Sequence, residues 1–342
     1  MEEILNPASL TLPKERKLFV ITLVFSCLVW LVCVLTIAPI VAVLLTGGII
    51  WFIHGLLIAR IKSEAVKLDI NQTPGLSQVF TDVCARLGVA EVPDLYLMQA
   101  GGVLNAFAMR FCARDFVVLY SDLLEAYGSD SGEIRFLLGH EIGHIRSKHI
   151  MKNMFLMPGL FLPLLGSAYN RACESSCDRH GAYASQDEAA SVRAMMILSG
   201  GKEVGRNLLA DAFSNQHHAA RGFFVSLHEL LSSYPTMSKR VSDLVDLQKR
   251  QNRPRPARNP FAYAVALFCP GARFGALGIL ISFYIVLISL TTFLPAANKA
   301  RQEAKKAIEG GATELEDIGK IQIEREGEDQ ESPEPSAAES PQ

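Results

Sequence analysis

The feature that most limits how this chain can fold is a stretch of 42 residues, from Leu18 to Ala59, that contains no Asp, Glu, Lys or Arg. As a single helix it would be about 60 Å long, roughly twice the hydrocarbon thickness of a bilayer. It is also too long for a cleaved signal peptide. We therefore expect residues 18–59 to fold back at Pro39 and to form two transmembrane helices.

Basic residues flank this stretch and indicate its orientation. Three precede the first span, none lies in the turn, and two follow the second span: Lys14, Arg16, Lys17, Arg60 and Lys62. By the positive-inside rule, the N-terminal segment 1–17 and the chain beyond the second span lie in the cytoplasm. The sequence thus predicts a multi-pass integral membrane protein with the lipid bilayer as a partner, in keeping with a bacterial inner membrane.

Two further apolar segments follow later in the chain. Residues 274–294 are uncharged and long enough for a third transmembrane helix, after a basic and apolar linker at 251–273. Residues 154–169 are apolar but shorter, and prolines interrupt them. We therefore expect this segment to face the membrane and not to form a single complete crossing. The tail 296–342 is charged and expected to be mostly disordered.

The net charge of −2 is the sum of two opposite contributions. From Glu309 to Gln342 there are 11 acidic and 2 basic residues, whereas the rest of the chain has 31 basic and 24 acidic residues. The acidic tail is therefore a candidate site for a protein partner. Because the body has no dense Lys or Arg face, the sequence predicts no binding to nucleic acid.

Between residues 63 and 250 the pattern is that of a mixed globular domain. Thr73-Pro74 begins a helix that Gly88 ends. Short strands are predicted at 94–98, 103–108 and 116–120, a helix from Asp130 to about Lys152, and mostly helical structure over 170–247. The fold class is α+β, mainly helical with a small β-sheet. The 7 cysteines lack zinc-ribbon spacing and are interpreted as reduced thiols, typical of a cytosolic face.

His140-Glu141-Ile142-Gly143-His144 is the strongest chemical signal in the chain. In a helix, residues i and i+4 lie one turn apart on the same face, so the two imidazoles can bind one zinc ion at adjacent positions. Glu141 projects beside them, where it can act as general base toward a zinc-activated water. The motif therefore predicts one zinc ion per chain.

A catalytic zinc ion usually takes three protein ligands and keeps a fourth position open. Glu174 is the best candidate for the third ligand, because Glu174 and Asp178 have an i, i+4 spacing on a predicted helix. Asp178 would then accept a hydrogen bond from a ligand imidazole. Judged from composition alone, a Glu/Asp pair at this spacing is more often part of a solvated helix face. The remaining histidines of this region are expected at the surface or in loops: His149, His180, His217, His218 and His228.

The HEIGH motif followed by E-x-x-x-D on a chain with membrane segments resembles the HtpX-type and CAAX-prenyl-endopeptidase superfamily of integral-membrane zinc metallopeptidases. The resemblance covers about residues 63–250. The segment Asn105-Ala106-Phe107-Ala108 is similar to the N-A-F-A element that lies along the substrate cleft in that superfamily, and Ser233 to Arg240 resembles its late H-P-x-x-x-x-R element.

The resemblance implies a zincin-type catalytic domain and a role for each matching residue. The zinc ligands would be His140, His144 and Glu174, and the base would be Glu141. Asp178 would hold a ligand, and Arg240 would lie near the substrate or oxyanion. The residues that contact the substrate would be Asn105, Ala106 and Phe107. Tyr234 stands where the superfamily has His. A phenol can donate a hydrogen bond to an oxyanion but carries no positive charge, and packing in a turn before Pro235 is the alternative.

These observations predict a membrane-anchored zinc metalloendopeptidase that hydrolyses membrane or misfolded proteins, as in protein quality control. His144 and Glu174 must reach one ion, so residues 154–169 are expected to form a short helical hairpin, a re-entrant piece or a membrane-facing lip. The alternative function is a catalytically retired membrane scaffold or chaperone that keeps the zinc site. The presence of Glu141 argues against that alternative, because a scaffold has no chemical need for this carboxylate.

Overall fold

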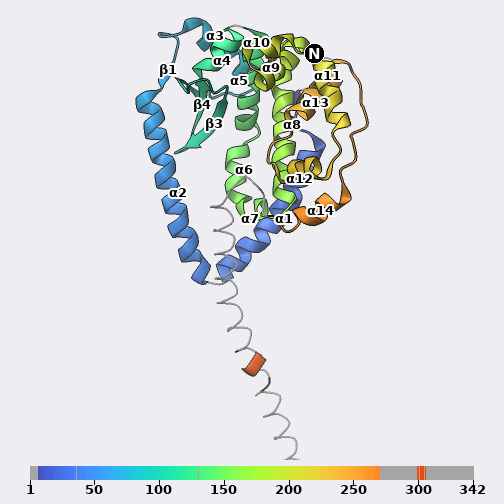
Figure 1. Ribbon diagram of the computed structural model, residues 1–342. Helices are drawn as coiled ribbons and strands as arrows, with labels where there is room; N and C mark the ends of the chain where they lie inside the picture. Colours follow the sequence, from blue (N-terminus) through green and yellow to red (C-terminus); the bar gives the residue numbers. More distant parts are fainter. Residues whose placement is uncertain are drawn as a thin grey trace, which may run out of the picture. The chain divides into compact units, whose positions relative to one another are not determined.

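The computed structural model describes residues 7–35, 37–129, 131–269, 299, 301–303 and 305. The chain divides into two compact units, residues 1–282 and 283–342. All the elements named below belong to the first unit (Figure 1). The transmembrane helix predicted at 274–294 lies outside the described residues, and so does nearly all of the tail, of which the few described residues are helical.

Two long apolar helices begin the fold after a short 3-10 helix (Pro7–Ser9). They are α1 (Pro13–Leu35) and α2 (Ile37–Glu64), and both are long and apolar enough to cross a membrane. The predicted break at Pro39 is wrong by a few residues, because α2 already begins at Ile37. Pro39 lies in the first turn of α2, where a helix needs no hydrogen bond from the backbone nitrogen.

A four-stranded sheet follows, with the strand order β1-β2-β4-β3. Strands β2 and β4 are parallel and the other pairs are antiparallel: β1 (Val66–Leu68), β2 (Asp94–Met98), β3 (Ala106–Phe111) and β4 (Arg114–Tyr120). The central strand β4 is buried on both faces. Val117 and Leu119 face the main core, whereas Phe116 and Val118 pack on Ile58 of α2. Strand β3 lies at an edge of the sheet.

The main core lies between the sheet and the helices α3, α5, α9 and α13. The helices confirm the predicted α+β class, in which helix predominates over a small sheet. Their bounds are α3 (Pro74–Arg86), α4 (Ser121–Tyr127), α5 (Gly132–Arg146), α6 (His149–Phe155), α7 (Met157–Leu160), α8 (Leu165–Ser185), α9 (Glu188–Gly200), α10 (Lys202–Asn207), α11 (Ala210–Ala219), α12 (Phe223–Leu231), α13 (Met237–Gln248) and α14 (Pro260–Ala266).

Helix α5 differs from its prediction at both ends. Its N-cap is Ser131, whose hydroxyl accepts a hydrogen bond from the Ile134 nitrogen at 3.1 Å, so the cap predicted at Asp130 is wrong. The helix ends at Arg146 and does not continue to Lys152. The cause is Lys148, whose φ of 55° is left-handed and separates α5 from α6.

Helices α5 and α8 pack closely because glycines lie at their contact. A β-carbon on Gly139 would lie 2.5 Å from the Ala184 β-carbon, and one on Gly181 would lie 2.5 Å from the carbonyl oxygen of Phe136. Real β-carbons do not approach other atoms this closely. The small residues therefore let the two helix axes approach, and this places the HEIGH turn of α5 beside the middle of α8.

We expect Gly139→Ala to lower the free energy of unfolding. The added methyl group overpacks the α5–α8 contact, which typically costs about 1–3 kcal/mol, whereas the gain in helix propensity is at most about 1 kcal/mol. Gly75→Ala is the matched control, because a β-carbon there meets no atom within 4 Å. Reversible denaturation in detergent measures both variants, and equal stability of the two would contradict the packing argument.

The apolar segment 154–169 reverses the chain between α6 and α8, through α7 (Figure 1). It packs on α1: the Gly159 nitrogen donates to Ser26 Oγ at 3.0 Å, and Trp30 Nε1 donates to the Phe155 carbonyl oxygen at 2.9 Å. The side chains of Met154 and Phe155 are 69% and 66% exposed. A contact of this segment with the bilayer stays a prediction.

Candidate metal centre

Donor atoms from α5 and α8 converge at one point. His140 Nε2 lies 3.3 Å from Glu174 Oε2, and His144 Nε2 lies 3.6 Å from Glu174 Oε1. The i, i+4 spacing of the two histidines puts their rings on one face of α5, with centroids 5.1 Å apart. His140 and Glu174 are buried, and one donor atom from each of the three side chains lies within 4.8 Å of the other two.

The spacing and the chemistry of these donors fit a zinc ion. Ligand atoms at ~2.1 Å from a tetrahedral zinc ion are ~3.4 Å apart, close to the observed separations of 3.3 and 3.6 Å. Two imidazole nitrogens and one carboxylate form a donor set that catalytic zinc sites use, and they leave a fourth position for water or substrate.

Burial and the neighbouring carboxylates act in opposite directions on the charges of the cluster. Burial alone would lower the pKa of His140, but the hydrogen bonds to Asp178 and Glu174 raise it to about 10. Burial alone would raise the pKa of Glu174, but His144 and His140 lower it to about 2. The carboxylates thus favour a charged His140, whereas burial lowers the pKa of His144 to about 3 and keeps this imidazole neutral, the form that binds a metal.

Asp178 and Arg240 hold His140 from the side opposite to Glu174. The Asp178 carboxylate accepts from His140 Nδ1 at 2.9 Å, which fixes the ring so that Nε2 faces Glu174. Arg240, at the start of α13, donates from Nε to Asp178 Oδ2 at 2.9 Å, and its Nη2 lies 3.4 Å from His140 Nδ1. The structure thus brings Arg240 to the site, where its guanidinium binds Asp178.

Glu141 lies between the donor cluster and strand β3. Its side chain is buried, and the backbone of Ala108 in β3 hydrogen-bonds to its carboxylate. Burial, opposed by His140, raises the pKa of Glu141 to about 7. A carboxyl group with such a pKa can both take and return a proton near neutral pH, which is what a general base in hydrolysis must do.

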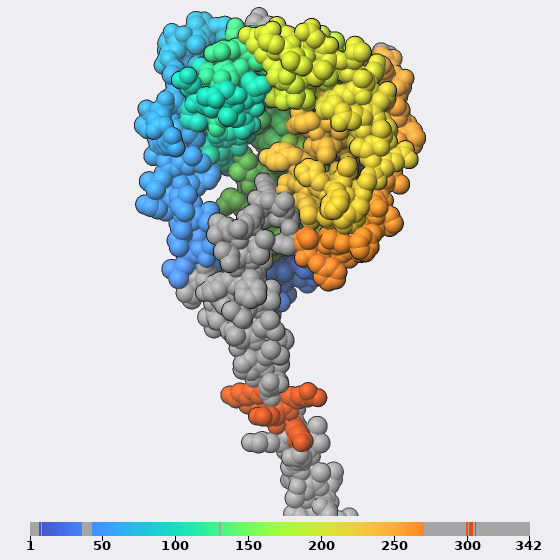
Figure 2. All heavy atoms as spheres, viewed as in Figure 1, coloured from blue at the N-terminus to red at the C-terminus, as the bar shows by residue number. Residues whose placement is uncertain are grey.

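The three predicted substrate-contacting residues lie at the edge strand beside Glu141. Ala106 begins β3, the Asn105 carbonyl oxygen accepts from the Tyr120 nitrogen at 3.1 Å, and the Phe107 ring packs edge-to-face on Tyr120. Figure 2 shows a hollow between the teal atoms on the sheet side and the yellow atoms of the later helices, with green atoms of the middle of the chain at its bottom. Substrate contact by these residues stays a prediction.

Tyr234 lies outside the buried cluster of metal donors. It lies in the loop between α12 and α13, and its side chain is 61% exposed, whereas Pro235 next to it is buried. The structure therefore puts this phenol at the protein surface near the start of α13. A role for Tyr234 at the oxyanion stays a prediction.

The sequence-based assignment missed two residues next to the ligands. The expectation that His149 lies at the surface is wrong: it is 1% exposed, and its Nδ1 lies 3.1 Å from His144 Nδ1. Its Nε2 lies 3.0 Å from Oε1 of Glu15, in the first turn of α1. His180 and His217 are also buried, against expectation. The one available signal was an acidic residue, Glu15, within the basic cluster that precedes the uncharged stretch beginning at Leu18.

Comparisons with known proteins agree with this geometry. The model of "Peptidase family M48" matches residues 71–168 and 160–248, which together span just over half of the chain. "Plastoglobule-localized metallopeptidase 48, chloroplastic" of Arabidopsis thaliana is 27% identical over 169 residues, covering 44% of this chain and 48% of that protein, so the chain matches about half the length of this relative. No solved structure matches. The matched region contains the HEIGH motif, Glu174, Asp178 and Arg240, and the chain therefore belongs to peptidase family M48, whose members are zinc-dependent metallopeptidases.

Proposed function

We propose that this protein is a membrane-anchored zinc endopeptidase that hydrolyses membrane or misfolded proteins at the cytoplasmic face of a bacterial inner membrane. The observation that carries the proposal is the convergence of the His140, His144 and Glu174 donor atoms beside the buried Glu141. The two long apolar helices support the membrane anchor. A scaffold without catalytic activity has no use for the carboxylate of Glu141.

His140, His144 and Glu174 would hold the zinc ion. When bound, zinc would supply a Lewis acid that polarises the scissile carbonyl and makes water more acidic. Glu141 would take a proton from the attacking water and pass it to the leaving amine. Glu141 is buried, and the backbone of Ala108 in β3 hydrogen-bonds to its carboxylate.

The other residues would orient the ligands and the substrate. Asp178 and Arg240 would keep His140 in the tautomer that points Nε2 toward the metal position. Tyr234 would donate a hydrogen bond to the developing oxyanion. The edge of β3, with Asn105 just before it, would pair with the backbone of an extended substrate, a mode in which main-chain hydrogen bonds supply the affinity. Such binding suits a peptidase with many misfolded substrates.

We expect the purified protein to contain about one zinc ion per chain and Glu174→Ala to contain much less. Losing one of three ligands leaves two imidazoles and a buried pocket, which is too few donors for tight binding. Metal analysis by mass spectrometry gives the zinc content, and treatment with 1,10-phenanthroline should abolish casein cleavage until zinc is restored. Glu203→Ala, at an exposed position of α10, is the control. Undiminished zinc in Glu174→Ala would remove Glu174 from the ligand set.

A further inference from the structure

We propose that Glu15, in the first turn of α1, is a positioning residue of the metal centre and acts on the ligand His144 through His149. The inference rests on the zinc site proposed above. Under this proposal, the first apolar helix, α1, supports the metal centre as well as anchoring the protein in the membrane.

Three side chains from α1, α6 and α5 form a line of hydrogen bonds. His149 Nε2 lies 3.0 Å from Glu15 Oε1, and His149 Nδ1 lies 3.1 Å from His144 Nδ1. Glu15 is 2% exposed and His149 is 1% exposed, so water does not compete for either contact. Both ring nitrogens of His149 are therefore engaged within the protein.

The positions of the protons follow from the role of His144. If His144 binds zinc through Nε2, its other nitrogen, Nδ1, carries a hydrogen and must donate it. The acceptor in reach is Nδ1 of His149, which must then carry its own hydrogen on Nε2. That hydrogen is donated to the Glu15 carboxylate. The Glu15 carboxylate thereby fixes the tautomer of His149, and His149 in turn fixes the tautomer of His144.

The two imidazole ligands are thus held in related ways. His140 donates directly to the Asp178 carboxylate, and His144 reaches the Glu15 carboxylate through one additional imidazole. A carboxylate behind a ligating histidine orients the ring and increases its basicity. A buried carboxylate without a hydrogen-bonding role is costly, so the position of Glu15 inside the protein is explained by this contact.

Helix α1 contacts α8 near its start and α7 further along, so Glu15 is held in place. The Leu12 nitrogen, just before α1, donates to Ser176 Oγ of α8 at 3.0 Å, and further along α1 the Ser26 hydroxyl accepts from the Gly159 nitrogen at 3.0 Å. A shift of α1 relative to α8 would move Glu15 and disturb the orientation of His144. The metal centre is therefore sensitive to the seating of this helix.

The test compares zinc affinity in the full-length protein, wild type against Glu15→Gln. Substitution of such outer contacts typically weakens metal binding about 10–100-fold, and we expect a loss in this range by competition with a chelator. The visible spectrum of the Co²⁺-substituted protein should shift, and kcat for casein should fall with KM unchanged. Glu64→Gln, at the exposed end of α2, is the control.

A second variant covers the case that Glu15→Gln folds poorly. His149→Ala cuts the line at its middle, so adding Glu15→Gln to it should weaken zinc binding little further. The proposal is overturned if Glu15→Gln keeps the wild-type zinc affinity and Co²⁺ spectrum, or if Glu64→Gln loses as much affinity. It is also overturned if wild type binds two zinc ions and Cys173→Ala loses one, because Glu15, His149 and Cys173 would then form a second site. A wild-type protein that binds no zinc would instead contradict the proposed function.

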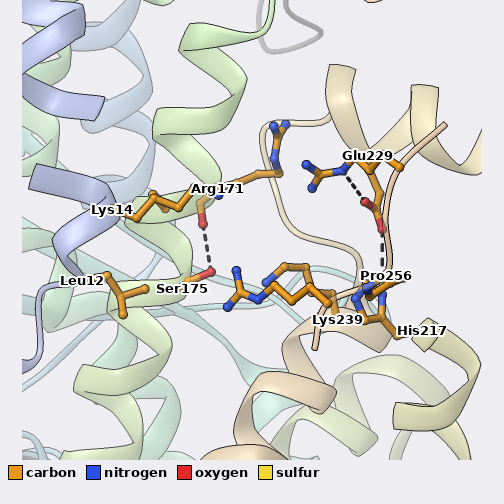
Figure 3. Close-up of a pocket in the computed structure, with 11 residues that line it drawn as sticks. Leu12, Lys14, Arg171, Ser175, His217, Glu229, Lys239 and Pro256 are labelled. Carbon is orange, nitrogen blue, oxygen red and sulfur yellow. Dashed lines mark hydrogen bonds and ion pairs between the residues drawn. The ribbon is translucent and has the colours of Figure 1, made fainter. Parts of the chain in front are cut away.

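A separate observation supports a second inference. A cavity of about 120 Å³ lies among the start of α1, α8, α11, α12, α13 and the segment after α13 (Figure 3). The described residues that line it include none of the proposed metal ligands. Five cationic side chains surround it: Lys14, Arg171, Lys239, Arg255 and Arg258.

The positive charge of this cavity is only partly balanced. Glu229 is the one carboxylate among the described residues that line it, and it binds Arg258 at 2.9 Å. Asp243, outside the lining, pairs with Lys239 and Arg255. Two carboxylates thus face five cations. Arg171 donates to the backbone carbonyl oxygens of Leu230 and Ser232, and burial together with Arg258 lowers its pKa to about 10.

We infer that this cavity binds a phosphate-bearing anion, and its position fits the headgroup of an anionic phospholipid. Lys14 lies four residues before the uncharged stretch that begins at Leu18. Glu229 of α12 and Arg258, two residues before α14, line the cavity. On these two helices the side chains of Phe224 and Phe261 are 79% and 66% exposed. Basic pockets beside apolar membrane segments are typical binding sites for lipid headgroups, and lysine and arginine side chains bind phosphate oxygens well.

Native mass spectrometry of the detergent-solubilised protein with phosphatidylglycerol tests this inference. Wild type should retain one lipid, and Lys14→Gln/Arg255→Gln should bind it about thirtyfold more weakly, since each cation near a phosphate contributes about fivefold. Lys17→Gln/Arg60→Gln is the control, because these residues flank the spans outside the cavity. Phosphatidylcholine and inorganic phosphate are the other probes. Binding of inorganic phosphate as tight as that of lipid would identify a soluble phosphate ligand. If Lys14→Gln/Arg255→Gln bound every probe as tightly as Lys17→Gln/Arg60→Gln does, the inference would be overturned.

Discussion

Glu141→Gln is expected to lower kcat for casein cleavage by about 10²–10⁴-fold while leaving the zinc content unchanged. The amide has nearly the same shape as the carboxylate but cannot accept the proton of the attacking water. Glu141 is buried beside the cluster and has a pKa raised to about 7, mainly by burial, which suits proton transfer near neutral pH. It is not among the donors that would hold the metal, so zinc analysis and chelator competition should give wild-type values.

This result also decides between the two functions that the sequence leaves open. A retired scaffold would show the same low activity in wild type and in Glu141→Gln, because the carboxylate would do no chemistry. Glu125→Gln, at an exposed position of α4, is the matched control for the loss of one carboxylate. Equal, chelator-sensitive cleavage by wild type and Glu141→Gln would instead show that another group is the base, and the role proposed for Glu141 would be wrong.

The parts of the site that the sequence predicts best are those encoded locally. The two histidines of HEIGH lie one helical turn apart, and this spacing alone puts their rings on one face of α5. Glu174 could only be nominated, because its distance from the histidines depends on how closely α5 and α8 pack. That packing depends on glycines such as Gly139, which sequence periodicity does not assign to a helix contact.

The residues that escaped prediction are brought together by long-range packing. Glu15 and His149 are separated by 134 positions along the chain, and no local pattern relates them. The left-handed backbone of Lys148 turns α6 away from α5 and carries His149 inward, and lysine is not a residue that predicts such a break. Strand β1 was missed for a different reason: three residues are too few for an alternating pattern to be recognised.

Arg240→Met is expected to lower the free energy of unfolding by about 3–5 kcal/mol, because it leaves the Asp178 carboxylate buried without its cation. The Arg240 side chain is 12% exposed and the Asp178 side chain 7% exposed, so water cannot replace the lost contact. Burial alone would lower the pKa of Arg240, but the carboxylates of Asp178, Glu174 and Glu141 raise it. Reversible denaturation in detergent measures the change. Zinc binding should weaken as well, since Asp178 holds His140.

Arg193→Met is the matched control, because Arg193 also contacts two carboxylates, Glu133 and Asp187, but its side chain is 46% exposed. Surface ion pairs typically contribute only about 0–1 kcal/mol, so this variant should be nearly as stable as wild type. Adding Asp178→Asn to Arg240→Met should restore part of the lost stability, because the second change removes the unpaired buried charge. Zinc affinity should stay low, since a neutral amide holds His140 less firmly than a carboxylate does. If Arg240→Met were no less stable than Arg193→Met, the buried pair would not be what fixes α13 against the metal centre, and a direct role of Arg240 toward the substrate would be the better explanation.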